Sequence, residues 1–413
     1  MRGRLALIGL LVSSLALSGA AAAASTDGQS DAEPGFQQRT PAAEAAFRDV
    51  TRCLNSGQNP RLDVLYLVDQ SDSIERDGLA DIQRDVLTSS IGQLQQFVSR
   101  EIDVAYLLAG FSTSAQLLTP EWVDAAGSES PAEIVDQALN VLPRQNNLTD
   151  WESGFRVAIE QFDRRGGDAC RMLIWMTDGA LIAGSTEESS LESLANICRP
   201  GIRPDGASDF TGPYTGLVHQ LRERGVPIFG VFFTNPGLVD GLDGFQQWKI
   251  SFMQPIVEGS GAVVAPTNPY GRLDLQGYPI DCTEMQNGVA ADGLANGAFI
   301  RSEDPVALAV EFLRLDAGIA GGSGLEVVDG RFTVPPGTAY FRAIVPSTDW
   351  RLIDPTGSAV QPGRVTEAES GGATSIEVDV DESLWGEWTV EPGGSAVVYL
   401  FTGLRLTLDR DLG

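Results

Sequence analysis

This sequence of 413 residues has few basic residues, and it contains a single histidine, His219, and a single lysine, Lys249. Only 28 lysines and arginines stand against 56 aspartates and glutamates, so the formal net charge is −28. An acidic surface repels phosphate backbones, which argues against nucleic-acid binding. Because Lys249 lies in QQWKIS and not in a GxxxxGK[ST] loop, a nucleotide site of the P-loop type is also excluded.

The usual catalytic patterns are absent as well. A Ser-His-acid triad would have to use His219, but this residue lies in the helical pattern TGLVHQLRERG, where a packing or helix-surface role is expected. The sequence has no GxSxG motif, and no GxGxxG follows its first predicted strand. We therefore expect a protein that is not an enzyme and that binds no nucleotide.

The N-terminus has the features of an export signal. Residues 1–24 contain Arg2 and Arg4, an apolar stretch and then small residues in SGAAAAA. The apolar stretch is too short to span a bilayer comfortably, and no later run of about 20 apolar residues follows. The sequence therefore predicts a secreted or cell-surface protein with no transmembrane segment in the mature chain.

The sequence contains only four cysteines, which is an even number. In an exported protein, four cysteines favour two disulfides over free thiols. No CxxC pair is present, which argues against a zinc site. The residues alone leave three pairings open among Cys53, Cys170, Cys198 and Cys282.

The hydropathy pattern divides the chain into two parts. Residues 25–45 lack periodicity and are predicted to form a flexible leader, whereas apolar strands alternate with amphipathic helices through residues 46–317. This alternation predicts an α/β fold, a doubly wound and mostly parallel sheet covered on both faces. Strands are expected at 61–69, 102–112, 115–122, 171–178, 226–233 and 262–266, and helices at 79–98, 131–142, 151–164, 215–225, 244–258 and 304–316.

The C-terminal part has a different pattern. A glycine-rich linker, 318–324, leads into short alternating segments that are broken by proline and glycine. Residues 325–413 are therefore predicted to form a smaller all-β sandwich, with Trp350 and Trp388 in its core.

Three separate segments carry oxygen-bearing side chains at the ends of predicted strands. Asp69, Ser71 and Ser73 follow the first strand in LYLVDQSDSI, Thr149 precedes a helix in NNLTDWESGF, and Asp178 ends a strand in LIWMTDGA. The carboxyl ends of strands in a doubly wound sheet gather ligands, and hydroxyl and carboxylate oxygens suit a hard divalent cation. A competing interpretation is that Ser71 and Ser73 cap the next helix and that Asp178 caps a turn.

DQSDS, the threonine of LTDWESG and the MTDG strand end, in this order and spacing, resemble the von Willebrand factor type A domain and its metal-ion-dependent adhesion site. The resemblance covers about residues 60–317. It implies that Ser71, Ser73 and Thr149 offer hydroxyls to Mg²⁺, Ca²⁺ or Mn²⁺, and that Asp69 and Asp178 act largely through bound water. Asp72 departs from the family pattern, in which glycine is common at this position.

The resemblance also implies partners and disulfides. In the family, the cation captures an acidic residue, Asp or Glu, of a partner protein; the alternative is a scaffold subunit of a surface assembly with structural metal or none. The family's strand order favours a Cys53–Cys170 bridge, which would leave Cys198, in an insertion at 180–211, to pair with Cys282. The C-terminal sandwich is similar to immunoglobulin-like modules.

Overall fold

The computed structural model describes residues 41–402 apart from several internal gaps. The predicted signal peptide, most of the leader, Lys249, Cys282 and the predicted strand 262–266 therefore lie outside the described residues. The gaps are residues 57–59, 99–101, 128–129, 142–147, 180, 185, 199–214, 234–252, 259–296, 303–305, 320–321, 326, 368–372 and 392–395.

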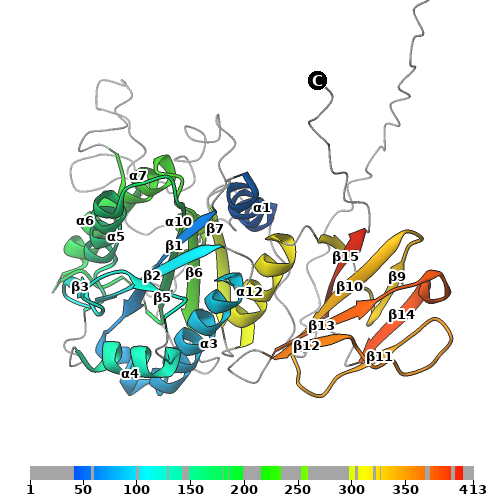
Figure 1. Cartoon of the computed structure of the whole chain (residues 1–413). Helices are drawn as coiled ribbons and strands as arrows, with labels where there is room; N and C mark the ends of the chain where they lie inside the picture. Colours follow the sequence, from blue (N-terminus) through cyan, green and yellow to red (C-terminus); the bar gives the residue numbers. More distant parts are fainter. Residues whose placement is uncertain are drawn as a thin grey trace, which may run out of the picture. The chain divides into compact units, whose positions relative to one another are not determined.

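A seven-stranded sheet forms the centre of the α/β part (Figure 1). Its order is β3-β2-β1-β5-β6-β7, with β4 also paired to β2. The pairs that join β2, β1, β5, β6 and β7 are parallel, while β3 and β4 run antiparallel to β2. The strands are β1 (Arg61–Asp69), β2 (Asp103–Phe111), β3 (Ala115–Leu117), β4 (Val123–Asp124), β5 (Cys170–Thr177), β6 (Ile228–Phe233) and β7 (Gly297–Ser302).

Helices cover both faces of this sheet, because alternate residues of its buried strands point to opposite sides. Val64 and Tyr66 of β1 belong to one hydrophobic cluster, and Leu65 and Leu67 belong to the other. The first cluster includes α1 (Pro41–Ser56), α3 (Ala80–Val98), α4 (Pro131–Val141) and α12 (Val306–Ile319); the second includes α5 (Trp151–Arg165), α6 (Glu187–Cys198), α7 (Leu217–Glu223) and α10 (Met253–Glu258). The predicted α/β fold is confirmed.

Three elements differ from the sequence-based prediction. Residues 41–45 belong to α1 and not to the leader, because Ala46, Phe47, Val50 and Leu54 recur at helical spacing and are buried. The strand beside β6 is β7, in GAFIRS, which is too short and too mixed to stand out in the sequence. The insertion at 180–211 contains a regular helix, α6.

The C-terminal part consists of two antiparallel sheets, of five strands and three strands. Phe332 and Trp388 from one sheet and Phe341 from the other share a core, and Trp350 packs against it. Helix α12 and β8 reach into the predicted linker 318–324. The strands are β8 (Ser323–Leu325), β9 (Arg331–Val334), β10 (Thr338–Val345), β11 (Arg351–Ile353), β12 (Arg364–Glu367), β13 (Thr374–Asp379), β14 (Gly386–Glu391) and β15 (Val397–Thr402).

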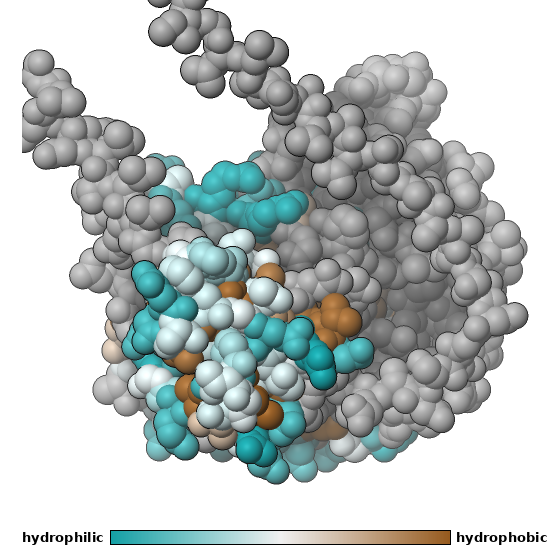
Figure 2. Space-filling view, turned by 90° about the vertical axis from the view of Figure 1, so that its right-hand side faces the viewer, coloured by the Kyte–Doolittle hydropathy of each residue, from teal (hydrophilic) through white to brown (hydrophobic). Residues whose placement is uncertain are grey.

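Few large hydrophobic side chains are exposed in the part of the chain that the structure describes. Val328 and Val365 are the large hydrophobic side chains exposed among the described residues. In the face shown in Figure 2, small hydrophobic areas are interspersed with hydrophilic ones. Within the same residues, no helix combines the length and the apolar character needed to cross a bilayer.

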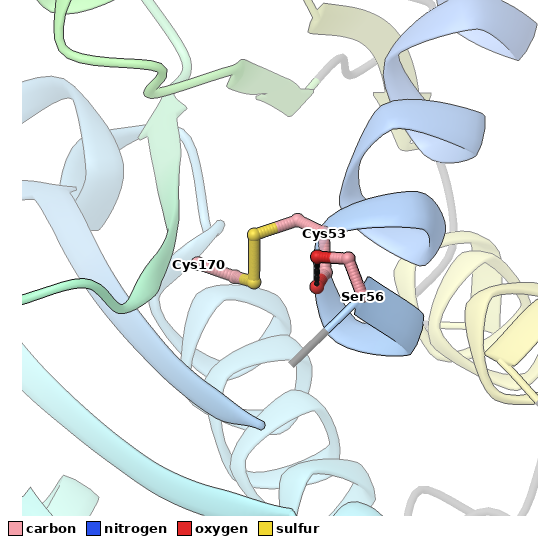
Figure 3. The surroundings of a disulfide bond; sticks show 3 residues. All are labelled: Cys53, Ser56 and Cys170. Carbon is pink, nitrogen blue, oxygen red and sulfur yellow. Dashed lines mark hydrogen bonds between the residues drawn. A yellow bond between two sulfur atoms is a disulfide. The ribbon is translucent and has the colours of Figure 1, made fainter. Parts of the chain in front are cut away.

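A disulfide joins Cys53 of α1 to Cys170 at the start of β5 (Figure 3). This is the pairing that the family resemblance implies. Cys198 is buried at the end of α6 and is also disulfide-bonded. Because Cys282 lies outside the described residues, the Cys198–Cys282 pairing stays a prediction.

Candidate metal centre

The candidate site lies where β1 and β5 end side by side. Val68 of β1 pairs with Met176 of β5, so that Asp69 and Asp178 follow at the same edge of the sheet. The chain runs from β1 to β2 on one side and returns to β5 on the other, so this edge is the point where the strand order reverses. Such a reversal opens a crevice at the carboxyl ends of the strands.

Two serine hydroxyls connect the first of the three segments to the last. Ser71 Oγ and Ser73 Oγ lie 2.8 Å apart, and Ser73 Oγ donates to Asp178 Oδ1 at 3.0 Å. Ser71 is the N-cap residue of α2 (Asp72–Arg76), but its side chain makes no capping hydrogen bond. The capping interpretation is therefore wrong for Ser71, whose hydroxyl is directed to the candidate site instead.

Asp69 is fully buried and held by several hydrogen bonds. Its Oδ1 accepts from the Ser71 amide at 2.8 Å, and its Oδ2 accepts from Thr177 Oγ1 at 2.6 Å. Its backbone carbonyl accepts from Gln70 Nε2 at 3.1 Å and from Gln83 Nε2 at 2.9 Å. Four donors thus fix both the carboxylate and the peptide of this residue.

Thr149 reaches the same place from the loop before α5. Gly179 shows how near Thr149 lies to Ser73. A Cβ atom built on this glycine would lie 3.6 Å from Thr149 Oγ1 and 4.0 Å from Ser73 Oγ, so both hydroxyls lie close to one point. The Thr149 backbone is fixed by two hydrogen bonds to Ile182, of 2.9 and 3.0 Å. The structure therefore places Asp69, Ser71, Ser73, Thr149 and Asp178, the five residues that the sequence singled out, close together at this edge of the sheet.

The two carboxylates repel each other in this buried setting. Burial raises the pKa of Asp69, while hydrogen bonds from Thr177 and Ser71 oppose the rise. Burial, and then the charge of Asp69, raise the pKa of Asp178 well above its usual range. A side-chain hydrogen bond with Asp178 also opposes the rise in the pKa of Asp69, and the other hydrogen bonds above come from hydroxyls and a backbone amide, which carry no positive charge.

This donor set fits a hard cation. Hydroxyl and carboxylate oxygens are the ligands of Mg²⁺, Ca²⁺ and Mn²⁺, and a divalent charge would relieve the repulsion between Asp69 and Asp178. In the described part of the chain, no group of three or more His, Cys, Asp or Glu side chains is placed for a metal ion. A cation at this edge would therefore depend on the hydroxyls of Ser71, Ser73 and Thr149.

Sequence reasoning missed three residues that support the site. Thr177 is fully buried, and its Oγ1 donates to Asp69 and accepts from the Gly179 amide at 3.2 Å. Gln70 and Gln83 donate to the Asp69 carbonyl, as described above. Thr177 could have been found as a polar residue at the end of an otherwise apolar strand, whereas nothing in the pattern of α3 marks Gln83.

Several solved structures show some similarity to this chain. A von Willebrand factor type A protein from Catenulispora acidiphila has 14% identity and a TM-score of 0.34, covering 84% of this chain and 59% of that one. The pilus adhesin SpaC from Lactobacillus rhamnosus GG has 12% identity and a TM-score of 0.36, covering 83% and 39%. Proximal thread matrix protein 1 from the mussel byssus, with a zinc-occupied MIDAS motif, has 15% identity and a TM-score of 0.32, covering 67% and 51%.

These similar proteins are a von Willebrand factor type A protein, a pilus adhesin and a thread matrix protein. The present chain spans less than two thirds of the length of each, from 39% to 59%. Neither a family model nor a curated protein matches the sequence.

Proposed function

We propose that this protein is an exported, metal-dependent protein-binding module of the adhesion type. In this proposal the α/β part is a von Willebrand factor type A domain, and an immunoglobulin-like sandwich follows it. The observation that carries the proposal is the hydrogen-bonded series Ser71–Ser73–Asp178, in which Ser73 and Asp178 are 105 positions apart and the Ser71 hydroxyl makes no helix-capping bond.

In the proposed site, each side chain has a separate task. Ser71, Ser73 and Thr149 offer neutral oxygens, and Asp69 and Asp178 supply negative charge at the edge of the sheet. When bound, Mg²⁺ or a similar cation supplies a positive centre that attracts a carboxylate, Asp or Glu, of a partner protein. Because the ligands within reach include three neutral hydroxyls, this chain leaves part of the positive charge available to the partner.

Export is part of the proposal. A signal peptide at residues 1–24 would deliver the chain to an oxidising compartment, and the Cys53–Cys170 disulfide is consistent with such a compartment. The second disulfide, Cys198–Cys282, would then fasten the end of α6 to the segment before β7. We place the mature protein at the cell surface or in the extracellular medium.

Calorimetry and a pull-down test the proposal. We expect the protein to bind Mg²⁺ or Mn²⁺ and to retain partner proteins from the extracellular fraction only while the cation is present. Asp69→Ala should abolish both, because it removes the carboxylate that Ser71 and Thr177 hold in place. Retention of partners in EDTA would instead favour a static scaffold, and the absence of cation binding in the wild type would refute the proposal.

Thr177→Val should weaken cation binding although valine has nearly the same shape. The substitution removes the donor to Asp69 Oδ2 and leaves the Gly179 amide without its acceptor. Loss of such outer hydrogen bonds typically lowers metal affinity by about 10–100-fold. Calorimetry with Mn²⁺ measures the effect, and Thr177→Ser, which keeps the hydroxyl, should bind like the wild type. Equal affinities for the valine and serine variants would show that Thr177 does not hold Asp69 for the cation.

A further inference from the structure

Helix α6 of the insertion presents a polar stripe toward the segment that carries Thr149. Ser190, Ser193 and Asn196 recur at every third residue of α6, a spacing that keeps helical side chains on roughly one face. Ser190 and Ser193 are buried, and Asn196 is half-buried. Buried polar groups require partners, so this stripe must be matched by polar groups on its neighbours.

The first contact of the stripe holds the segment that pairs with Thr149. Ser190 Oγ accepts from the Ala183 amide at 3.1 Å. The residue before Ala183, Ile182, forms the two-hydrogen-bond bridge with the Thr149 backbone. Through this connection, α6 fixes the short extended segment against which Thr149 is aligned.

The other two contacts hold residues that follow Thr149 in the sequence. Ser193 Oγ donates to Asp150 Oδ1 at 3.3 Å, the same oxygen that accepts from the Glu152 amide at the N-terminus of α5. Asn196 Nδ2 donates to Glu152 Oε2 at 3.0 Å. The cap and the first turn of α5, which follow Thr149 directly, are therefore attached to α6.

The position of α6 itself is fixed by the core. Leu194, Ala195, Ile197 and Cys198 are buried in the cluster that covers the α5 face of the sheet. Because these side chains lock the helix in place, its polar stripe is a rigid support and not an adaptable surface.

From these contacts we infer that α6 is a positioning clamp for Thr149, and that this helix sets the affinity of the site for divalent cations. The inference rests on the proposed function, since it concerns the same five-residue site. Ser193 and Asn196 are positioning residues in this scheme, because they act through Asp150 and Glu152 and lie outside the five-residue site. Helix α6 is therefore part of the binding site's support.

The test compares Ser193→Ala/Asn196→Ala with the wild type, both as the full mature chain. Calorimetry with Mn²⁺ should give a dissociation constant about tenfold higher for the double variant. Hydrogen exchange without metal should be faster in peptides that cover Thr149 and Ile182, while the thermal midpoint changes little. Ser189→Ala is the matched control, because Ser189 lies on the same helix but bonds only to Thr186 in the described hydrogen bonds. Ser193→Thr/Asn196→Gln, which retains the polar groups, should recover part of the affinity.

The possible outcomes distinguish a failure of the proposed clamp from a failure of the proposed function. If the double variant binds Mn²⁺ like the wild type, or if its exchange at Thr149 and Ile182 is unchanged, the clamp is refuted while the proposed function stands. If the wild type binds no Mn²⁺, the proposed function fails, and hydrogen exchange still decides whether α6 holds Thr149. Should the double variant not fold, Asn196→Ala alone, at a half-buried position, provides the same two measurements.

Discussion

Asp178→Asn should make the metal-free protein more stable at neutral pH and at the same time abolish its response to Mg²⁺. The pKa of Asp178 is raised by burial and by the charge of Asp69. Ionised Asp178 therefore costs free energy in the folded state, and asparagine keeps a hydrogen-bond acceptor for Ser73 Oγ without the charge. The expected gain in the free energy of unfolding is on the order of 1 kcal/mol in EDTA.

The stability gain of Asp178→Asn should increase as the pH rises. Because the folded-state pKa of Asp178 lies above the ordinary value of 3.8, the folded wild type holds more protons than the unfolded chain between these two values. Its free energy of unfolding therefore falls as the pH rises through this window, and Asp178→Asn removes that fall. Urea denaturation in EDTA should show the two proteins converging toward pH 4 and diverging above it.

Magnesium should make the wild type more stable than Asp178→Asn. A bound cation stabilises only the folded wild type, by RT ln(1 + [L]/Kd), or about 2.7 kcal/mol at a concentration 100 times Kd. The asparagine variant should gain nothing from Mg²⁺. Asp81→Asn, at an exposed position of α3, is the matched control and should behave like the wild type in both conditions. A variant less stable than the wild type in EDTA at neutral pH would show that Asp178 and Asp69 are not in conflict.

Loss of the Cys53–Cys170 disulfide should cause a large fall in the free energy of unfolding. The bond spans 117 residues, and closing a loop of this size restricts the unfolded chain strongly. It also fastens α1, whose Phe47 packs on Phe229 of β6 with ring centroids 4.8 Å apart. We expect Cys53→Ala/Cys170→Ala to lower the free energy of unfolding by about 2–5 kcal/mol, measured by urea denaturation.

Ser56→Ala serves as the control for the disulfide variant. Its hydroxyl donates only to the Cys53 carbonyl among the described hydrogen bonds, at 2.8 Å, so its removal should change stability by about 0.5 kcal/mol or less (Figure 3). Cation affinity of the folded double-alanine variant should stay unchanged, because Cys170 begins β5 and Asp178 follows its opposite end. A double-alanine variant as stable as the wild type would mean that α1 is held by its apolar contacts alone.

Most of the α/β architecture could be predicted from the sequence because most of its elements have a local signal. The strand Arg61–Asp69 is continuously apolar, and α3 repeats its buried residues at helical spacing. Strand β7 lacked such a signal: GAFIRS is short, and its place in the sheet depends on pairing with β6 across a long intervening segment. A pairing of this kind is decided by tertiary contacts and not by local propensity.

The sequence by itself determined which residue types could form the site. Asp69, Ser71 and Ser73 lie two positions apart, and Thr149 and Asp178 stand at other transitions between strands and helices. Their hydroxyl and carboxylate oxygens are a property of composition, and a parallel sheet brings such transitions to one edge.

Only the tertiary structure decided how these side chains are held. The Ser73–Asp178 hydrogen bond, the support of Asp69 by Thr177 and the contacts of α6 around Thr149 join segments that are distant in sequence. Their energies depend on burial, which raises the pKa of both carboxylates and makes each hydroxyl donor matter. The apolar pattern indicates which strands and helices are buried, but the burial of these polar side chains depends on how the segments pack together.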